Sequence, residues 1–168
     1  MYTVPKHDQV HELDNVPVPD TTAPDPLLLA DGATLVIAYR SVPSLNRAQA
    51  GNRLSNATSL VVFQDCFAIH FGLPNDHAFA THPLAEGGLR PCGAFEVESS
   101  SWIRGLEERN RGHPRHDPQL FDRLRHWVWT FHDTVLECAA LSYVVEEEVD
   151  PAVDLVLRMR TLLVPGER

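Results

Sequence analysis

The chain has 168 residues, with 14 Lys and Arg against 23 Asp and Glu, so its formal net charge is −9. Hydrophobic residues make up 43% of the chain, which is enough for one globular domain with a substantial core. The acidic balance argues against a protein that binds nucleic-acid phosphates, because such proteins need clustered Lys and Arg. No segment approaches the roughly 18 apolar residues of a membrane span, and no secretory leader is evident. We therefore expect a cytoplasmic protein without nucleic-acid or membrane partners.

Residues 1–31 differ in composition from the rest of the chain. They contain five prolines and six acidic residues but only one cation, Lys6. Proline removes backbone donors and like charges repel, so we expect an acidic, Pro-rich N-terminal arm outside an α+β domain of residues 32–168. His7 and His11 have the spacing of a metal-binding helix, but the prolines favour a solvated tail.

The first predicted elements after the arm are strands. A β-rich run at 35–39 is followed, after a polar connection at 44–59, by apolar runs at 60–64 and 66–71. Asp65 alone separates the last two runs, which leaves open either one bent strand or a tight pair of strands.

The stretch 72–91 is long for a loop in a compact domain. We expect it either to carry a short helix capped by Asn75 or Asp76, or to serve the function directly. If it closes over a site as a lid, Gly87 and Gly88 are its natural hinge. Two glycines in a long loop are also ordinary turn residues.

The second half of the chain combines a strand at 92–98 with three helices predicted from cap and proline signals. The three helices begin at 99–101, 117–118 and 150–151. Alternating apolar residues leave a strand open as the alternative for 153–163. Because strands and helices do not alternate regularly, we expect a single α+β domain built on an antiparallel β-sheet or half-barrel with two or three packed helices.

The clearest motif is a β-hairpin formed by 126–132 and 135–145. Side chains alternate across a sheet, which gives the hairpin a polar face and an apolar face. The polar face would hold His126, Thr130, His132 and Glu137, and the apolar face Trp127, Trp129, Phe131, Leu136 and Cys138. We expect the apolar face to be core and the polar face to be the floor of a site.

The length of the hairpin turn decides which polar groups meet. A two-residue turn would place His132 opposite Val135 and Thr130 opposite Glu137, with the imidazole of His132 diagonal to the Glu137 carboxylate. A carboxylate orients an imidazole and favours its charged form, as a general base requires. An odd-length turn would separate the two groups, and a solvent-facing polar pair is the simpler alternative.

Seven of the nine histidines lie between His70 and His132, which raises the odds of a histidine site. We therefore predict a small enzyme that acts on a small organic molecule by histidine-centred acid–base chemistry, as a lyase, an isomerase or a hydrolase. His132 is the expected acid or base, Glu137 its orienting partner, Thr130 a hydrogen-bonding helper and His70 a second acid. The substrate-binding candidates are His82, His116, Glu96 and Arg115.

A metal site is the alternative for the histidines of the long loops. His113 and His116 have the spacing of half a zinc site, which His82 or His132 would have to complete. Only this one close pair is present, so we expect no metal and no other cofactor, and we keep a zinc enzyme as an alternative.

Two further expectations concern thiols and partners. Cys66, Cys92 and Cys138 lack the close spacing of a redox or zinc motif, so reduced, buried thiols are expected. The rival to an enzyme is a non-catalytic binding or assembly module with structural histidines. In that module the arm of residues 1–31 would engage a partner or the other subunit of a homodimer.

Overall fold

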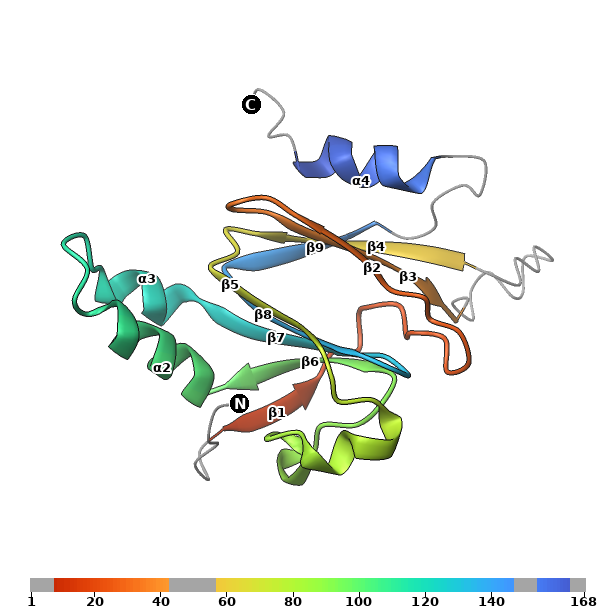
Figure 1. Ribbon diagram of the computed structural model, residues 1–168, viewed down its shortest axis with the longest axis horizontal. Helices are drawn as coiled ribbons and strands as arrows, with labels where there is room; N and C mark the ends of the chain where they lie inside the picture. Colours follow the sequence, from red (N-terminus) through yellow and green to blue (C-terminus); the bar gives the residue numbers. More distant parts are fainter. Residues whose placement is uncertain (1–7, 43–56, 147–153, 164–168) are drawn as a thin grey trace.

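Two antiparallel sheets pack face to face in the computed structural model, which describes residues 8–42, 57–146 and 154–163 (Figure 1). The five-stranded sheet has the order β1 (Gln9–Glu12), β6 (Gly93–Glu98), β7 (Arg125–Thr130), β8 (Val135–Ala140) and β5 (Ala68–Gly72). The four-stranded sheet has the order β2 (Leu27–Ala30), β3 (Leu35–Ser41), β4 (Ala57–Gln64) and β9 (Ser142–Glu146). The predicted α+β class with an antiparallel sheet is confirmed.

The main core lies between the two sheets and takes alternate residues from both. Ile37 and Phe63 come from the four-stranded sheet, and Trp129 and Leu136 come from the five-stranded sheet. The ring of Phe63 meets that of Trp129 edge-on, with centroids 5.0 Å apart. Because side chains alternate along a strand, the residues between these core positions face the outer side of each sheet.

Helix α4 (Leu155–Leu163) covers the outer side of the four-stranded sheet (Figure 1). Its fully buried Met159 packs in one cluster with Val36, Ala38 and Leu60. This cover explains why nearly every residue of β3 is buried, since one face meets the main core and the other meets α4. The expected last helix is confirmed over these residues, and its predicted start at 150–151 lies outside the described residues.

Helices also cover the outer side of the five-stranded sheet. These are α2 (Ser101–Asn110), α3 (Pro118–Arg123) and the 3₁₀ helices η1 (Asp76–Thr81) and η2 (Ala85–Gly87). As the sequence predicts, Ser100, Asp117 and Asn75 cap the first turns of α2, α3 and η1. Within the described ranges, no helix has the length and apolar character that a membrane crossing would require.

Residues 8–31, for which composition predicts an arm outside the core, supply an edge strand to each sheet. Strand β1 pairs with β6 and β2 pairs with β3. Val16 joins the main core, and the Tyr39 hydroxyl donates to the Pro17 carbonyl over 2.7 Å. His11 lies on β1 rather than on a helix, and its helical partner in the sequence pattern, His7, is outside the described residues.

The chain crosses between the sheets at two points where the sequence predicts continuous or tightly paired strands. The runs 60–64 and 66–71 become β4 and β5 in different sheets, and the run 135–145 divides at Leu141 into β8 and β9. The two crossings lie together, because the Leu141 amide donates to the Gln64 carbonyl over 3.1 Å. Most of the predicted connection 44–59 lies outside the described residues.

The hairpin of β7 and β8 forms with a longer turn than predicted. The Phe131 amide donates to the Thr134 carbonyl over 2.8 Å, and the last strand pair is Thr130 opposite Val135. The predicted pairs of Val135 with His132 and of Glu137 with Thr130 are therefore wrong. The register has moved by two residues, and a shift of two leaves each strand residue on its predicted face.

Candidate functional site

The carboxylate of Glu137 lies at the centre of a polar cluster on the outer side of the five-stranded sheet. Glu137 lies in the middle of β8, opposite Val128 on β7 and His70 on β5. Its side chain is only 4% exposed. A carboxylate at this depth needs hydrogen-bond donors around it, because an unpaired buried charge is strongly unfavourable.

His126 and Ser100 continue this cluster in a line. His126 Nε2 lies 3.0 Å from Glu137 Oε2, and His126 Nδ1 lies 2.9 Å from Ser100 Oγ. With Glu137 ionised, Nε2–H donates to the carboxylate and Nδ1 of the neutral ring accepts from the Ser100 hydroxyl. The fully buried ring also packs against Trp102, with centroids 4.8 Å apart. A hydroxyl, an imidazole and a carboxylate are therefore connected in series.

Two further histidines approach the second oxygen of Glu137. His70 Nδ1 lies 3.4 Å and His82 Nε2 lies 3.6 Å from Glu137 Oε1. The Leu84 amide donates to His82 Nδ1 over 3.2 Å, so the ring proton of a neutral His82 is on Nε2 and faces the carboxylate. His82 is buried, whereas the side chain of His70 is 56% exposed. His70 thus connects the buried carboxylate to the surface.

The junction of β6 and α2 fixes the position of Ser100. Ser99 has a φ of 52°, a left-handed conformation that is unusual for a residue other than glycine. Ser100 Oγ accepts from the Ile103 amide over 3.2 Å and so caps the helix. Asp8 Oδ2 accepts from the amide and the hydroxyl of Ser101 over 2.9 and 2.7 Å. The hydrogen bond from Ile103 and the two bonds from Ser101 to Asp8 therefore hold the turn that presents Ser100.

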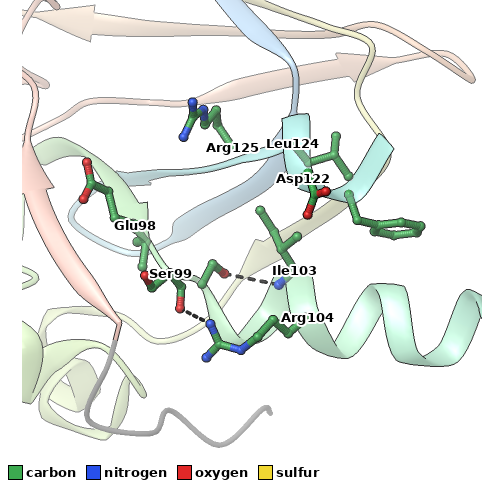
Figure 2. A pocket seen from close by; sticks show the side chains of 10 residues that line it. Glu98, Ser99, Ile103, Arg104, Asp122, Leu124 and Arg125 are labelled. Carbon is green, nitrogen blue, oxygen red and sulfur yellow. Dashed lines mark hydrogen bonds between the residues drawn. The ribbon is translucent and has the colours of Figure 1, made fainter. Parts of the chain in front are cut away.

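A cleft of about 410 Å³ opens at this junction (Figure 2). It is lined by Val97, Glu98, Ser99, Ser100, Ile103, Arg104, Phe121, Asp122, Leu124 and Arg125. Among the lining side chains labelled in Figure 2, Ile103 and Leu124 are apolar and Glu98, Arg104, Asp122 and Arg125 are charged. The volume is within the range of small-molecule sites. Ser100 is the member of the hydrogen-bonded line that borders this cleft.

His132, the predicted acid or base, lies in the turn and has a different partner. Its Nδ1 is 2.6 Å from Asp76 Oδ2, and its backbone carbonyl accepts a hydrogen bond from the Asp76 amide over 3.0 Å. The four-residue turn carries the ring away from the strand register on which the expected pair with Glu137 depended. The neighbour of Glu137 on the same face of β7 is therefore His126 and not His132.

Two other predicted site residues on strands, Thr130 and Glu96, also lie away from the Glu137 carboxylate or have other partners. Thr130 lies on the same face as Glu137, but its hydroxyl accepts from the Gly93 amide and donates to the Arg90 carbonyl. Glu96 lies opposite Trp127, on the other face of the sheet, where its carboxylate is 3.9 Å from Arg125 Nε. Of the predicted strand positions, the structure brings together His70 and Glu137.

The histidines of the α2–α3 loop have local roles. His113 Nδ1 accepts from the Arg115 amide over 3.1 Å, and His116 Nδ1 lies 3.1 Å from Asn110 Oδ1. His82, their proposed partner in a zinc site, faces Glu137 instead. Across the described part of the chain, no group of three or more His, Cys, Asp or Glu side chains has an arrangement suited to a metal ion.

Sequence reasoning missed the contact between Ser100 and His126, although both residues had a signal. Hairpin alternation places His126 on the face of Glu137, and the serines at 99–101 are recognisable as helix caps. What the sequence does not show is that the cap of α2 lies above β7, since that contact joins residues 26 positions apart.

Comparison with known proteins assigns no family to the chain. It matches no protein-family model, no curated protein and no solved structure. The arrangement of Ser100, His126 and Glu137 therefore has to be interpreted from its own geometry and chemistry.

Proposed function

We propose that the protein is a small-molecule hydrolase that cleaves an ester or thioester through Ser100, with His126 as the base and Glu137 as its positioning partner. The observation that carries this proposal is the series of hydrogen bonds from Ser100 Oγ through His126 to Glu137, of 2.9 and 3.0 Å. It keeps the histidine-centred acid–base chemistry expected from the sequence and moves it from His132 to His126.

The chemistry follows from the role of each group. Ser100 Oγ would form a bond to the acyl carbon while its proton passes to His126 Nδ1. The carbon–oxygen or carbon–sulfur bond of the substrate breaks, and the leaving group takes that proton. Water then attacks the acyl-serine, His126 accepts its proton, and the proton returns to Ser100 as the acid departs. Glu137 stabilises the imidazolium that forms in each half-reaction and holds the ring in one tautomer.

The cleft supports a small substrate. Its volume of about 410 Å³ suits a small substrate, and Ile103 and Leu124 are apolar lining residues that a short acyl chain could contact. Arg125 provides a guanidinium for a polar or anionic group of the substrate, whereas the Arg104 guanidinium is engaged by the Asp8 carboxylate and the Ser99 carbonyl. Glu98 and Asp122 limit the number of negative charges that the cleft accepts.

The same hydrogen bonds would also hold α2 against the sheet, and a purely structural role predicts a different experiment. Ser100 caps α2 and Asp117 caps α3, each through one side-chain oxygen. Removing either cap should lower the free energy of unfolding by about 1 kcal/mol. Only the Ser100 change should affect hydrolysis.

The test measures hydrolysis of p-nitrophenyl acetate and butyrate and of the matching thioesters by the wild type, Ser100→Ala, His126→Phe and Asp117→Ala. We expect Ser100→Ala and His126→Phe to lose at least about 100-fold in kcat/KM, while Asp117→Ala retains the wild-type value. A fluorophosphonate ester should label Ser100 in the wild type, as shown by peptide mass spectrometry. Absence of both hydrolysis and labelling in the folded wild type contradicts the proposal, as does equal activity of Ser100→Ala.

A further inference from the structure

Two cysteines meet where the chain crosses from one sheet to the other. Cys66 Sγ lies 3.1 Å from Cys138 Sγ, about 1 Å longer than the roughly 2.05 Å of a disulfide bond. The two residues are 72 positions apart in sequence, so the spacing of cysteines in the chain gives no sign of the pair. The third cysteine, Cys92, lies immediately before β6 with a φ of 55°, and within the described part of the chain its sulfur contacts neither of the other two.

We propose that Cys66 and Cys138 form a reversible intramolecular disulfide when the protein meets a hydroperoxide. Cys66 is partly exposed and so can meet the oxidant, whereas Cys138 is fully buried in the main core. The pair therefore divides into an accessible thiol that reacts first and a sheltered thiol that resolves the product. This inference is independent of the proposed hydrolase activity.

The surroundings of Cys66 hold its backbone in place for this reaction. The Cys66 amide donates to the Ala33 carbonyl over 2.7 Å, and the next amide, of Phe67, donates to the Ala139 carbonyl over 2.7 Å. The first bond ties the crossing to the four-stranded sheet and the second ties it to β8. The two sulfur atoms need to approach by only about 1 Å to reach the length of a disulfide bond.

The electrostatics favour the same order of events. The hydrogen bond from the Cys138 thiol lowers the pKa of Cys66, and that same contact together with burial raises the pKa of Cys138. Burial also raises the pKa of Cys92, with further contributions from the Asp76 and Asp20 carboxylates. Since the thiolate is the nucleophile, Cys66 is the most reactive of the three thiols.

Oxidation of the two thiols takes place in two steps. The Cys66 thiolate attacks one oxygen of the hydroperoxide and the oxygen–oxygen bond breaks, so that Cys66 becomes a sulfenic acid. The leaving alkoxide or hydroxide takes up the proton that the thiol had released to solvent and departs as an alcohol or water. Cys138 Sγ then attacks Cys66 Sγ, the sulfur–oxygen bond breaks, and the thiol proton leaves with the hydroxide as water. Two thiols have lost two electrons to one peroxide.

The test treats the full chain with hydrogen peroxide at two to ten equivalents and follows intact mass and peptide maps without reduction. We expect a loss of about 2 Da and a peptide linking Cys66 to Cys138 in the wild type and in Cys92→Ser, both reversed by dithiothreitol. The thermal midpoint should rise by about 5–10 °C on oxidation, because the new bond closes a long loop.

Cys66→Ala is the matched control, since its side chain is partly exposed and its removal leaves the core residue Cys138 in place. This variant should show neither the 2 Da loss nor the rise in thermal midpoint. The inference is overturned if Cys66 gains one or more oxygen atoms without a crosslink, if all three thiols stay reduced, or if the main product links Cys92 or two separate chains.

Discussion

On β7 and β8, neighbouring residues point to opposite sides of one sheet, and both sides are covered. Trp129 and Leu136 face the other sheet and contact apolar groups, while His126 and Glu137 face α2 and the 3₁₀ helices. All four are almost completely buried. The inner side is held mainly by close packing, with few polar atoms such as Trp129 Nε1, which donates to the Tyr39 hydroxyl over 3.4 Å, whereas the outer side needs a donor for every acceptor. The proposed function rests on this buried polar network of the outer side, whose hydrogen bonds depend on one another.

Replacing Glu137 by Leu should lower the free energy of unfolding more than any other change on the outer side. Leucine removes the acceptor of the His126 Nε2 hydrogen bond, and it removes the carboxylate that lies 3.6 Å from His82 Nε2, a buried atom that has no hydrogen-bond partner of its own among the described residues. We expect the free energy of unfolding to fall by about 3–5 kcal/mol, measured by urea denaturation.

A double-mutant cycle distinguishes the network from simple packing. The change His126→Phe should cost less in the Glu137→Leu background than in the wild type, with a coupling energy of at least about 1 kcal/mol. The control is Leu136→Ala, the preceding residue on the inner side, which should lose about 2–5 kcal/mol through a cavity and add independently to His126→Phe. Strict additivity in the Glu137 cycle would contradict a connected network.

Replacing Thr130 by Val should give an intermediate loss on the same outer side. The Thr130 hydroxyl accepts from the Gly93 amide over 2.9 Å and donates to the Arg90 carbonyl over 2.7 Å. Valine has the same shape but leaves both backbone groups without this partner, so a loss of about 1–3 kcal/mol is expected in urea unfolding. Thr58→Val at a partly exposed position of β4 is the control and should stay within about 0.5 kcal/mol of the wild type. An equal change in the two variants would show that the Thr130 hydroxyl has no stabilising role.

The smallest effect on stability should come from Asp20, an exposed carboxylate in the segment between β1 and β2. The Thr22 hydroxyl, the Thr22 amide and the Ala23 amide donate to Asp20 Oδ1 and lower its pKa from 3.8 to about 2. Because the pKa is lower in the folded state, the stabilisation is present above about pH 3.8 and is lost as the pH falls through about 2.

Thermal midpoints of the wild type and Asp20→Asn between pH 5 and pH 2 measure this contribution. The wild type should be slightly more stable at pH 5, and the difference should shrink as the pH approaches 2. A difference that stays constant over this range would show that ionisation of Asp20 does not contribute.

Local patterns predicted much of the fold. The alternation over 126–138 assigned both sides of β7 and β8 correctly, because a strand has a fixed period of two. Cap residues such as Ser100 and Asp117 marked the helix starts, since an unsatisfied first turn needs a side-chain acceptor.

The candidate site depended on information that local patterns do not hold. The sequence predicted a two-residue turn, whereas the strand pairing ends at Thr130 and Val135, and His132 in the turn between them contacts Asp76. The contact of Ser100 with His126 depends on where α2 packs, which is a property of the whole fold. The edge strand β1 was missed because its pairing with β6 joins segments more than 80 residues apart.

The place of Asp8 has a practical consequence for anyone who shortens this protein. Its carboxylate binds Ser101 and Arg104, so a segment whose composition invites removal holds the first turn of α2 beside Ser100. A version beginning at residue 32 would lack this anchor and both edge strands β1 and β2. Affinity tags and truncations for biochemical work should leave the chain intact from residue 8 onward.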